Sequence, residues 1–260
     1  MKLKVPLMAD LYAKGEKPEI LFWVSSIGSF DEKAKKITIA FTKILNKANI
    51  NFAILGREES CTGDDAKRAG NEFLFQIKAL ENIETLKKYD IRKIVTFDPH
   101  SFNTLKNEYP DLGGNYEVWH HTQFIAMLLE QHKITIDVEK LKKVNVTFHD
   151  PCYLGRANNE YESPRKIFQK LSVNLHEMKR SKSNSLCCGA GGSQMFKEPE
   201  KGNKEINILR TEEALSTNST MIVTACPFCK LMLTDGVQQK EKQNEVEVLD
   251  IAEIVSEAMC

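Results

Sequence analysis

The 260-residue sequence lacks the features that mark several other classes of protein. It has no charge excess, since 36 Lys and Arg balance 36 Asp and Glu. A nucleic-acid partner usually requires a basic excess, so we expect none. No apolar run approaches the roughly 20 residues that a membrane-spanning helix needs. The first residues are mixed and charged, unlike a secretory signal. We therefore expect a cytoplasmic protein without a direct membrane span, whose contact with the inner membrane is at most peripheral and made through a partner.

What the sequence does have is seven cysteines, which is many for a cytoplasmic chain. Disulfides rarely persist in a reducing compartment, so metal binding or redox chemistry is the better explanation. Five of the seven lie between residues 152 and 229, while Cys61 and Cys260 stand apart. The cysteines between residues 152 and 229 are therefore the first candidates for a site.

Short apolar runs that alternate with helix-like stretches predict an α/β fold with mostly parallel sheets. We expect strands at 19–24, 51–56, 91–97, 143–150 and 220–225. A long helical stretch is expected over 64–88. Ser29 with Glu32, and Asp250 with Glu253, match the capping-box pattern that precedes a helix.

The sequence contains an internal repeat. IVTFDPHSFNTL (94–105) aligns with IVTACPFCKLML (222–233), and FWVSSIG (22–28) aligns with FHDPCYLG (148–155). Cys61-Thr62-Gly63 aligns with Cys187-Cys188-Gly189, and 34 residues separate Ser26 from Cys61, as they separate Cys152 from Cys187. Matched segments in the same order at the same spacing predict two homologous α/β halves. We place a leader at 1–18, a degenerate half at 19–131 and an intact half at 132–260.

The cysteines of the second half are expected to meet at one site. They are Cys152, Cys187, Cys188, Cys226 and Cys229. Each follows a predicted strand or lies in a Gly-rich loop, and the carboxyl ends of parallel strands share one edge of a sheet. Thiolates are soft ligands that suit iron–sulfur clusters or zinc. Five cysteines exceed the four of a tetrahedral zinc site, which favours an iron–sulfur cluster.

These motifs resemble the cysteine-rich (CCG) domain of heterodisulfide reductase B/D-like iron–sulfur proteins. Glycerol-3-phosphate dehydrogenase C-type and lactate-utilisation iron–sulfur oxidoreductase subunits have similar domains. The segments that carry the resemblance are HDPCYLGRANNEYESPRK (149–166), SNSLCCGAGGSQMFKE (183–198), TACPFCKLMLTDGV (224–237), GREESCTGDDAKRAGNEFLFQ (56–76) and FNTLKNEYPDLGGNYEVWHHTQF (102–124).

The resemblance implies one [4Fe–4S] cluster of the noncubane type in the C-terminal half. By position, its ligands are the five cysteines of that half. Some relatives place zinc in such a motif, so zinc remains the alternative metal.

The first half departs from the family pattern. Ser26, Thr62, Asp98 and Ser101 occupy the positions that cysteines hold in many relatives, and only Cys61 is retained. One thiolate cannot hold a cluster, so we expect no cluster there. The alternative is a labile site that uses Cys61, Asp98 and His100.

The function expected from this resemblance is that of an iron–sulfur electron-transfer subunit in an oxidoreductase complex. The sequence has no flavin or nicotinamide fingerprint and no ferredoxin-type cysteine cluster, so a membrane-bound or flavin-containing redox subunit is the expected partner. Electrons would pass between a flavoprotein or ferredoxin-type protein and an acceptor such as the quinone pool. Two alternatives remain: thiol–disulfide reduction at the cluster, and a structural zinc site at Cys187, Cys188, Cys226 and Cys229.

Three polar groups near these motifs have two interpretations each. His149 and Asp150 either tune the cluster or form local turn bonds, and we prefer the turn. His120-His121 either bind metal or cap the strand-to-helix junction, and we prefer the cap. Arg165 is one of several basic residues around the cysteine loops, which either dock an acidic partner or are solvated, and we prefer solvation.

Overall fold

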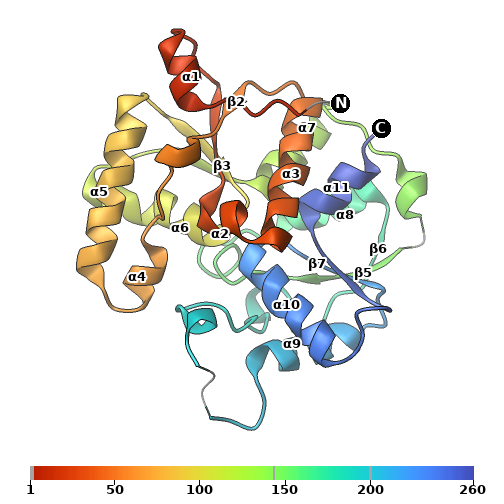
Figure 1. Ribbon diagram of the computed structural model, residues 1–260. Helices are drawn as coiled ribbons and strands as arrows, with labels where there is room; N and C mark the ends of the chain where they lie inside the picture. Colours follow the sequence, from red (N-terminus) through yellow and green to blue (C-terminus); the bar gives the residue numbers. More distant parts are fainter. Residues whose placement is uncertain (1–2, 143, 199–200) are drawn as a thin grey trace.

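The computed structural model describes residues 3–142, 144–198 and 201–260 (Figure 1). Its strands form two four-stranded sheets in which every pairing is parallel. The first sheet has the order β2 (Phe52–Ala53), β1 (Ile20–Trp23), β3 (Lys93–Thr96) and β4 (Glu117–His120). The second has the order β6 (Asn174–Leu175), β5 (Asn145–His149), β7 (Met221–Thr224) and β8 (Glu247–Asp250). The predicted α/β fold with two halves is confirmed, whereas the boundaries at residues 18/19 and 131/132 stay predictions.

Helices connect the strands of each sheet. The first half contains α1 (Met8–Ala13), α2 (Ser25–Phe30), α3 (Glu32–Lys47), α4 (Asp64–Arg68), α5 (Glu72–Lys88), α6 (Pro99–Asn103) and α7 (His121–Glu130). The second half contains α8 (Glu162–Leu171), α9 (Ile206–Leu215), α10 (Pro227–Gln239) and α11 (Ile251–Ala258). Within the described ranges, none of these helices combines the length and the apolar character needed to cross a bilayer.

The register of the strands reproduces the repeat that the sequence predicts. Phe22 of β1 lies opposite Val95 of β3, and Phe148 of β5 lies opposite Val223 of β7. These are the residues that the alignment of the two halves places in equivalent positions. The repeat is therefore a repeat of structure, and equivalent positions of the two halves can be compared directly.

Among the described residues, side chains that alternate along the strands form a core shared by both sheets and an outer core beside each sheet. Phe22 and Val95 from the first sheet join Phe148 and Val223 from the second in one central cluster. The other faces of the sheets point outward: Leu21 packs in a cluster beneath α5, and Ile222 packs in a separate cluster beneath α9 and α10. Because the largest core draws on both sheets, neither half can bury its inner face alone.

The helices of the central layer are exchanged between the halves. α7, which follows the last strand of the first half, packs against α8 of the second half. α11, which follows the last strand of the second half, packs against α3 of the first, and Figure 1 shows these two helices side by side. This reciprocal packing fixes the two sheets relative to each other, and with them the loops at their carboxyl ends.

The N-termini of the helices test the two predicted capping boxes. Asp250 and Glu253 form the predicted capping box of α11. The pattern of Ser29 and Glu32 was misleading, because the cap of α3 is Asp31, whose carboxylate accepts the N–H groups of Lys33 and Ala34. Asp31 sits directly before the first helical residue, whereas Ser29 belongs to α2. The stretch predicted as one helix over 64–88 is divided in two at residues 69–71.

Candidate metal centre

The cysteines of the second half lie at the carboxyl edge of its sheet. Cys152 lies three residues beyond the end of β5, and Cys226, the N-cap of α10, lies two residues beyond the end of β7. Cys229 lies in the first turn of α10, while Cys187 and Cys188 come from the loop between α8 and α9. Chain segments that are far apart in sequence thus converge on one site, as the strand order predicts.

The five thiols gather at one site. Cys187 lies beside Cys152 and Cys188, close enough for its charge to raise the pKa of both. The Sγ atoms of Cys188 and Cys229 are 3.3 Å apart, and Cys229 also contacts Cys226. All five are free thiols. Cys188, Cys226 and Cys229 are buried, whereas Cys152 and Cys187 are partly exposed, so one edge of the group faces the surface.

Crowding controls the protonation of these thiols. Hydrogen bonds from Cys152 and Cys188 lower the pKa of Cys187, so this thiol is the first to ionise. The same hydrogen bond to Cys187 raises the pKa of Cys152 and that of Cys188. Burial raises the pKa of Cys229. A metal that binds here must displace the remaining protons, so its affinity should rise with pH.

Backbone groups around the thiols are arranged to stabilise negative charge. The N–H of Gly189 lies 3.3 Å from Cys187 Sγ, and this turn requires a φ of 95° at Gly189, which favours glycine. α10 begins with Pro227, so Cys226 is its N-cap residue and Cys229 lies in its first turn, where backbone N–H groups are free of helical partners. A helix N-terminus favours thiolate over thiol. The site is therefore suited to an anionic centre built from sulfur ligands.

His149, the last residue of β5, belongs to this site, although the sequence favoured a turn role for it. It is 1% exposed, and one of its ring nitrogens lies within 4.8 Å of the Sγ atoms of both Cys188 and Cys229. Burial, and then the charge of Arg210, lower the pKa of His149 well below its ordinary value, so the ring is neutral. Arg210 lies in the middle of α9, and no local sequence motif indicates that it belongs to the site.

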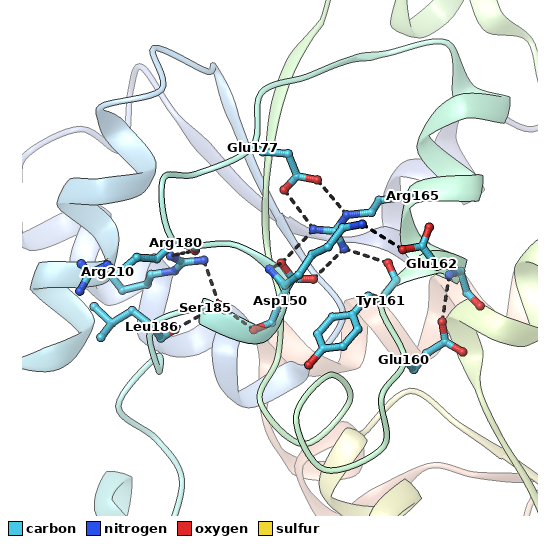
Figure 2. Close-up of polar contacts among 12 residues, drawn as sticks. Asp150, Glu160, Tyr161, Glu162, Arg165, Glu177, Arg180, Ser185, Leu186 and Arg210 are labelled. Atoms are coloured by element: carbon cyan, nitrogen blue, oxygen red, sulfur yellow. Dashed lines mark hydrogen bonds and ion pairs between the residues drawn. The ribbon is translucent and has the colours of Figure 1, made fainter.

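Asp150 contributes an anchor for the cysteine loops. Its carboxylate accepts hydrogen bonds from both terminal nitrogens of Arg165, at 2.7 and 2.9 Å, and from the backbone N–H of Lys182 at 2.7 Å. Figure 2 shows Arg165 held between Asp150, Glu177 and the carbonyl of Tyr161. The expectation of a local turn bond at Asp150 was therefore wrong, because its carboxylate is bound to residues distant in sequence. The expectation that Arg165 is solvated was also wrong, because Arg165 is buried.

The equivalent place in the first half is a small polar cavity. Asp98 occupies the Cys226 position as the N-cap of α6, and its carboxylate accepts the hydroxyl of Ser101 at 2.7 Å, where the second half has Cys229. The turn at Gly63 is retained, with its N–H 3.4 Å from Cys61 Sγ. A cavity of about 40 Å³ remains between these groups, lined also by Ser26. Oxygen groups that satisfy one another have replaced the thiols here.

The two sites are neighbours across the junction of the halves. The ring of His100, from the first half, stacks on Tyr153 with centroids 4.1 Å apart, and Tyr153 follows Cys152 in the chain. His100 also contacts the edge of Phe228, which lies between Cys226 and Cys229. The first half thus forms part of the wall of the cysteine site.

The His120-His121 pair has a structural role, as preferred from the sequence. His120 is the N-cap of α7 and forms a capping box with Gln123. The Nε2 atom of His121 lies 2.9 Å from Asp250 Oδ1, and both side chains are fully buried. Since Asp250 is the equivalent N-cap in the second half, this contact joins the two halves at their sheet edges.

The donor set fits a metal centre with soft ligands. Five sulfur atoms within one partly buried site match the preference of thiolates for iron–sulfur clusters or zinc. The group is larger than the four ligands of a structural zinc ion. Hydrogen-bond donors at Gly189 and at the start of α10 are of the kind that stabilise clusters.

A fold of two α/β halves with this cysteine pattern defines a class of iron–sulfur proteins, and the chain belongs to the cysteine-rich domain family known as CCG. The family model matches residues 28–106 and 146–234. One match falls in each half of the fold, so both halves descend from the same kind of domain.

Comparison with curated proteins gives relatives of one kind. The chain is 45% identical to the probable iron–sulfur-binding oxidoreductase FadF of Bacillus subtilis, over 98% of this chain and 36% of that protein. It is 40% identical to the EtfAB:quinone oxidoreductase of Syntrophomonas wolfei, over 94% of this chain and 35% of that protein. It is 34% identical to the D-type component of the dihydromethanophenazine:CoB–CoM heterodisulfide reductase of Methanosarcina barkeri, over 94% and 60% respectively.

These matches confirm the predicted resemblance to heterodisulfide reductase-like iron–sulfur proteins. The chain spans between 35% and 60% of the length of these relatives. Their names describe iron–sulfur or redox proteins, so iron–sulfur binding is a property of the group to which this chain belongs.

Proposed function

We propose that Cys152, Cys187, Cys188, Cys226 and Cys229 hold one [4Fe–4S] cluster of the noncubane type. The observation that carries this proposal is the gathering of five free thiols at the carboxyl edge of one sheet, with the Sγ atoms of Cys188 and Cys229 3.3 Å apart. When bound, such a cluster supplies one-electron transfer.

The residues around the site serve electron transfer in three ways. Burial of Cys188, Cys226 and Cys229 excludes water from one side of the group. The N–H groups of Gly189 and of the first turn of α10 stabilise negative charge on sulfur. The partly exposed Cys152 and Cys187 form the edge where a partner can approach closely.

The proposed role is that of an iron–sulfur subunit of an oxidoreductase. It would relay electrons between a flavoprotein or ferredoxin-type partner and an acceptor such as the quinone pool. The names of the relatives support this role, since one is an EtfAB:quinone oxidoreductase and another, from Chromohalobacter salexigens, is a probable membrane-anchored ferredoxin. A cytoplasmic location, peripheral to the inner membrane through a membrane-bound or flavin-containing partner, follows from the same proposal.

We further propose one cluster per chain. In the first half, Asp98 and Ser101 bind each other where the second half has two cysteines. The aligned positions Ser26 and Thr62 offer hydroxyl groups, which are poor replacements for thiolates. The first half then acts as scaffold and as part of the wall of the site, through His100.

Analysis of iron, acid-labile sulfide and zinc in anaerobically purified protein tests this proposal. About four irons per chain are expected, with an EPR signal after oxidation. Cys187→Ala and Cys226→Ala should lose the iron, whereas Cys61→Ala, at the position equivalent to Cys187, should retain it. Cys260→Ala controls for the loss of a thiol far from the site.

Two results would overturn the proposal in different ways. About one zinc per chain and no iron would indicate a structural metal site. Clearly more than four irons, with a loss in Cys61→Ala, would show that the first half also holds a cluster.

A further inference from the structure

The hydrogen bond between His149 and Arg210 determines where the imidazole carries its proton. The Nε atom of Arg210 lies 2.9 Å from His149 Nδ1. A guanidinium offers only N–H donors and no acceptor, so Nδ1 must be the acceptor. A neutral imidazole has one N–H, which is then on Nε2.

Arg210 is held firmly in the orientation that this assignment requires. It is fully buried, and its Nη1 donates to the carbonyl of Arg180 at 2.9 Å and to Glu213 at 3.0 Å. Its Nη2 donates to Ser185 Oγ at 3.1 Å, a contact that Figure 2 shows. Both terminal nitrogens of Arg210 are therefore occupied by other partners, and its Nε–H donates to His149.

The Nε2–H of His149 has no such partner. It is buried and makes no hydrogen bond to any group in the described part of the chain. A buried donor without a partner is destabilising and calls for an explanation. The neighbouring thiols of Cys188 and Cys229 supply one, since a ligand atom of His149 lies within 4.8 Å of both sulfurs.

This geometry separates two roles that histidine can play beside a metal. As a ligand, His149 would need a lone pair on Nε2, and its Nδ1 would normally donate a proton to a neighbouring acceptor. Arg210 presents a donor to Nδ1 instead, which keeps the proton on Nε2. The imidazole is therefore arranged to donate to sulfur and is blocked from binding iron.

We propose that His149 is a positioning residue that donates an Nε2–H hydrogen bond to sulfur at the cysteine site, and that Arg210 enforces the required tautomer. The inference rests on the proposed cluster in the second half. Hydrogen bonds to the sulfur atoms of a cluster stabilise its more negative, reduced form and so raise its reduction potential. His149 and Arg210 thus set the potential without touching iron.

The test compares two substitutions of His149 in the iron-loaded protein by EPR-monitored redox titration. His149→Leu removes the donor and should lower the reduction equilibrium constant about tenfold, which corresponds to about 59 mV for a one-electron couple. His149→Gln places an amide N–H near the Nε2 position and should recover much of this loss. His176→Leu, at an exposed histidine of the same half, should leave the potential unchanged.

A second measurement needs no substitution, so a variant that fails to fold does not prevent the test. Pulsed EPR of the wild-type protein labelled with ¹⁵N-histidine should show weak nitrogen coupling, together with an exchangeable proton that is replaced after transfer to D₂O. Both signals are expected from a histidine that donates to sulfur.

Three results would overturn the inference. Strong nitrogen coupling would show that His149 is a ligand to iron. An unchanged potential in His149→Leu with full iron content would show that the donor has no effect, while the proposed cluster would stand. A protein that binds no iron would overturn the proposed function and this inference with it.

Discussion

At the scale of single residues, equivalent positions of the two halves meet at the junction between them. His100 of the first half occupies the position of Phe228 in the second, and the two rings are in contact. His100 Nδ1 lies 2.8 Å from Asp64 Oδ2. Burial alone would lower the pKa of His100, but its bond to Asp64 and the charge of Asp98 outweigh burial and raise the pKa to about 9.

The raised pKa of His100 predicts how stability depends on pH. The folded pKa lies above the ordinary value of 6.5, so the folded protein binds this proton more tightly than the unfolded chain. The stabilisation is fully present below pH 6.5 and is lost as the pH rises toward 9. Urea denaturation of wild type should therefore show a falling free energy of unfolding across this range.

His100→Phe provides the matched variant for this prediction, because phenylalanine is the residue of the other half at this position. It keeps an aromatic ring against Tyr153 and removes the titrating group. We expect a smaller fall in stability between pH 6.5 and 9 than in wild type, whatever the absolute stability of the variant. An identical slope in both proteins would contradict the prediction.

The residues of the cysteine site show what sequence can and cannot provide. The convergence of Cys152, Cys187 and Cys226 could be expected, because each follows a strand or a glycine turn in a repeated pattern. Arg210 could not, because it lies inside a helix between non-cysteine residues, and its importance depends on the buried contact with His149. Short sequence motifs predict loops and helix caps, but they do not predict contacts between buried groups that are far apart in the sequence.

At the scale of elements, the crossing of α9 and α10 depends on a glycine. A Cβ added at Gly236 would lie 2.9 Å from Thr211 Cβ and 3.3 Å from the carbonyl oxygen of Asn207. Since α10 carries Cys226 and Cys229, this close approach also sets the position of half of the cysteine site. The side chain of residue 236 is therefore restricted by packing, although alanine would favour the helix itself.

Gly236→Ala is expected to destabilise the protein by about 1–3 kcal/mol, because the added methyl group overpacks the crossing. Thr211→Ala should cost less by itself, since the Thr211 hydroxyl has no hydrogen-bond partner in the ranges that the structure covers. The double variant should recover part of the loss. Denaturation midpoints of the single and double variants measure this coupling, and simple additivity would contradict the packing argument.

The strands that the sequence missed are short or partly exposed. β4 begins with the exposed Glu117, β8 begins with the exposed Glu247, and β6 comprises only two residues, Asn174 and Leu175. None of the three forms the apolar run that marks a buried strand. The inner strands β1, β3, β5 and β7 were recognised because they are almost entirely buried and their sequences are largely apolar.

At the scale of the whole molecule, the two halves are joined through their interior. The central core contains residues of both sheets, and the reciprocal packing of α7 on α8 and of α11 on α3 crosses the junction. The buried contact between His121 and Asp250 adds a polar link. The sequence showed the repeat but not the packing of helices of one half against helices of the other. An apolar helix face has the same sequence pattern whether it packs within its own half or against the other half.

This shared interior predicts a single cooperative unfolding transition. Both tryptophans, Trp23 and Trp119, lie in the first half, so their fluorescence reports on the unfolding of that half. Far-UV circular dichroism reports on both halves. In metal-free, reduced protein, the two signals should have the same denaturant midpoint.

Two matched core substitutions make this prediction stringent. Leu233→Ala removes a fully buried side chain from the outer core of the second half, and Leu105→Ala does so in the outer core of the first. Each should cost about 2–5 kcal/mol. If the halves unfold together, Leu233→Ala must lower the midpoint seen by tryptophan fluorescence as much as the midpoint seen by circular dichroism, although it contacts neither tryptophan. A fluorescence midpoint that stays at the wild-type value in Leu233→Ala, while Leu105→Ala lowers it, would mean that the first half folds independently and that the cysteine site does not depend on the core shared with that half.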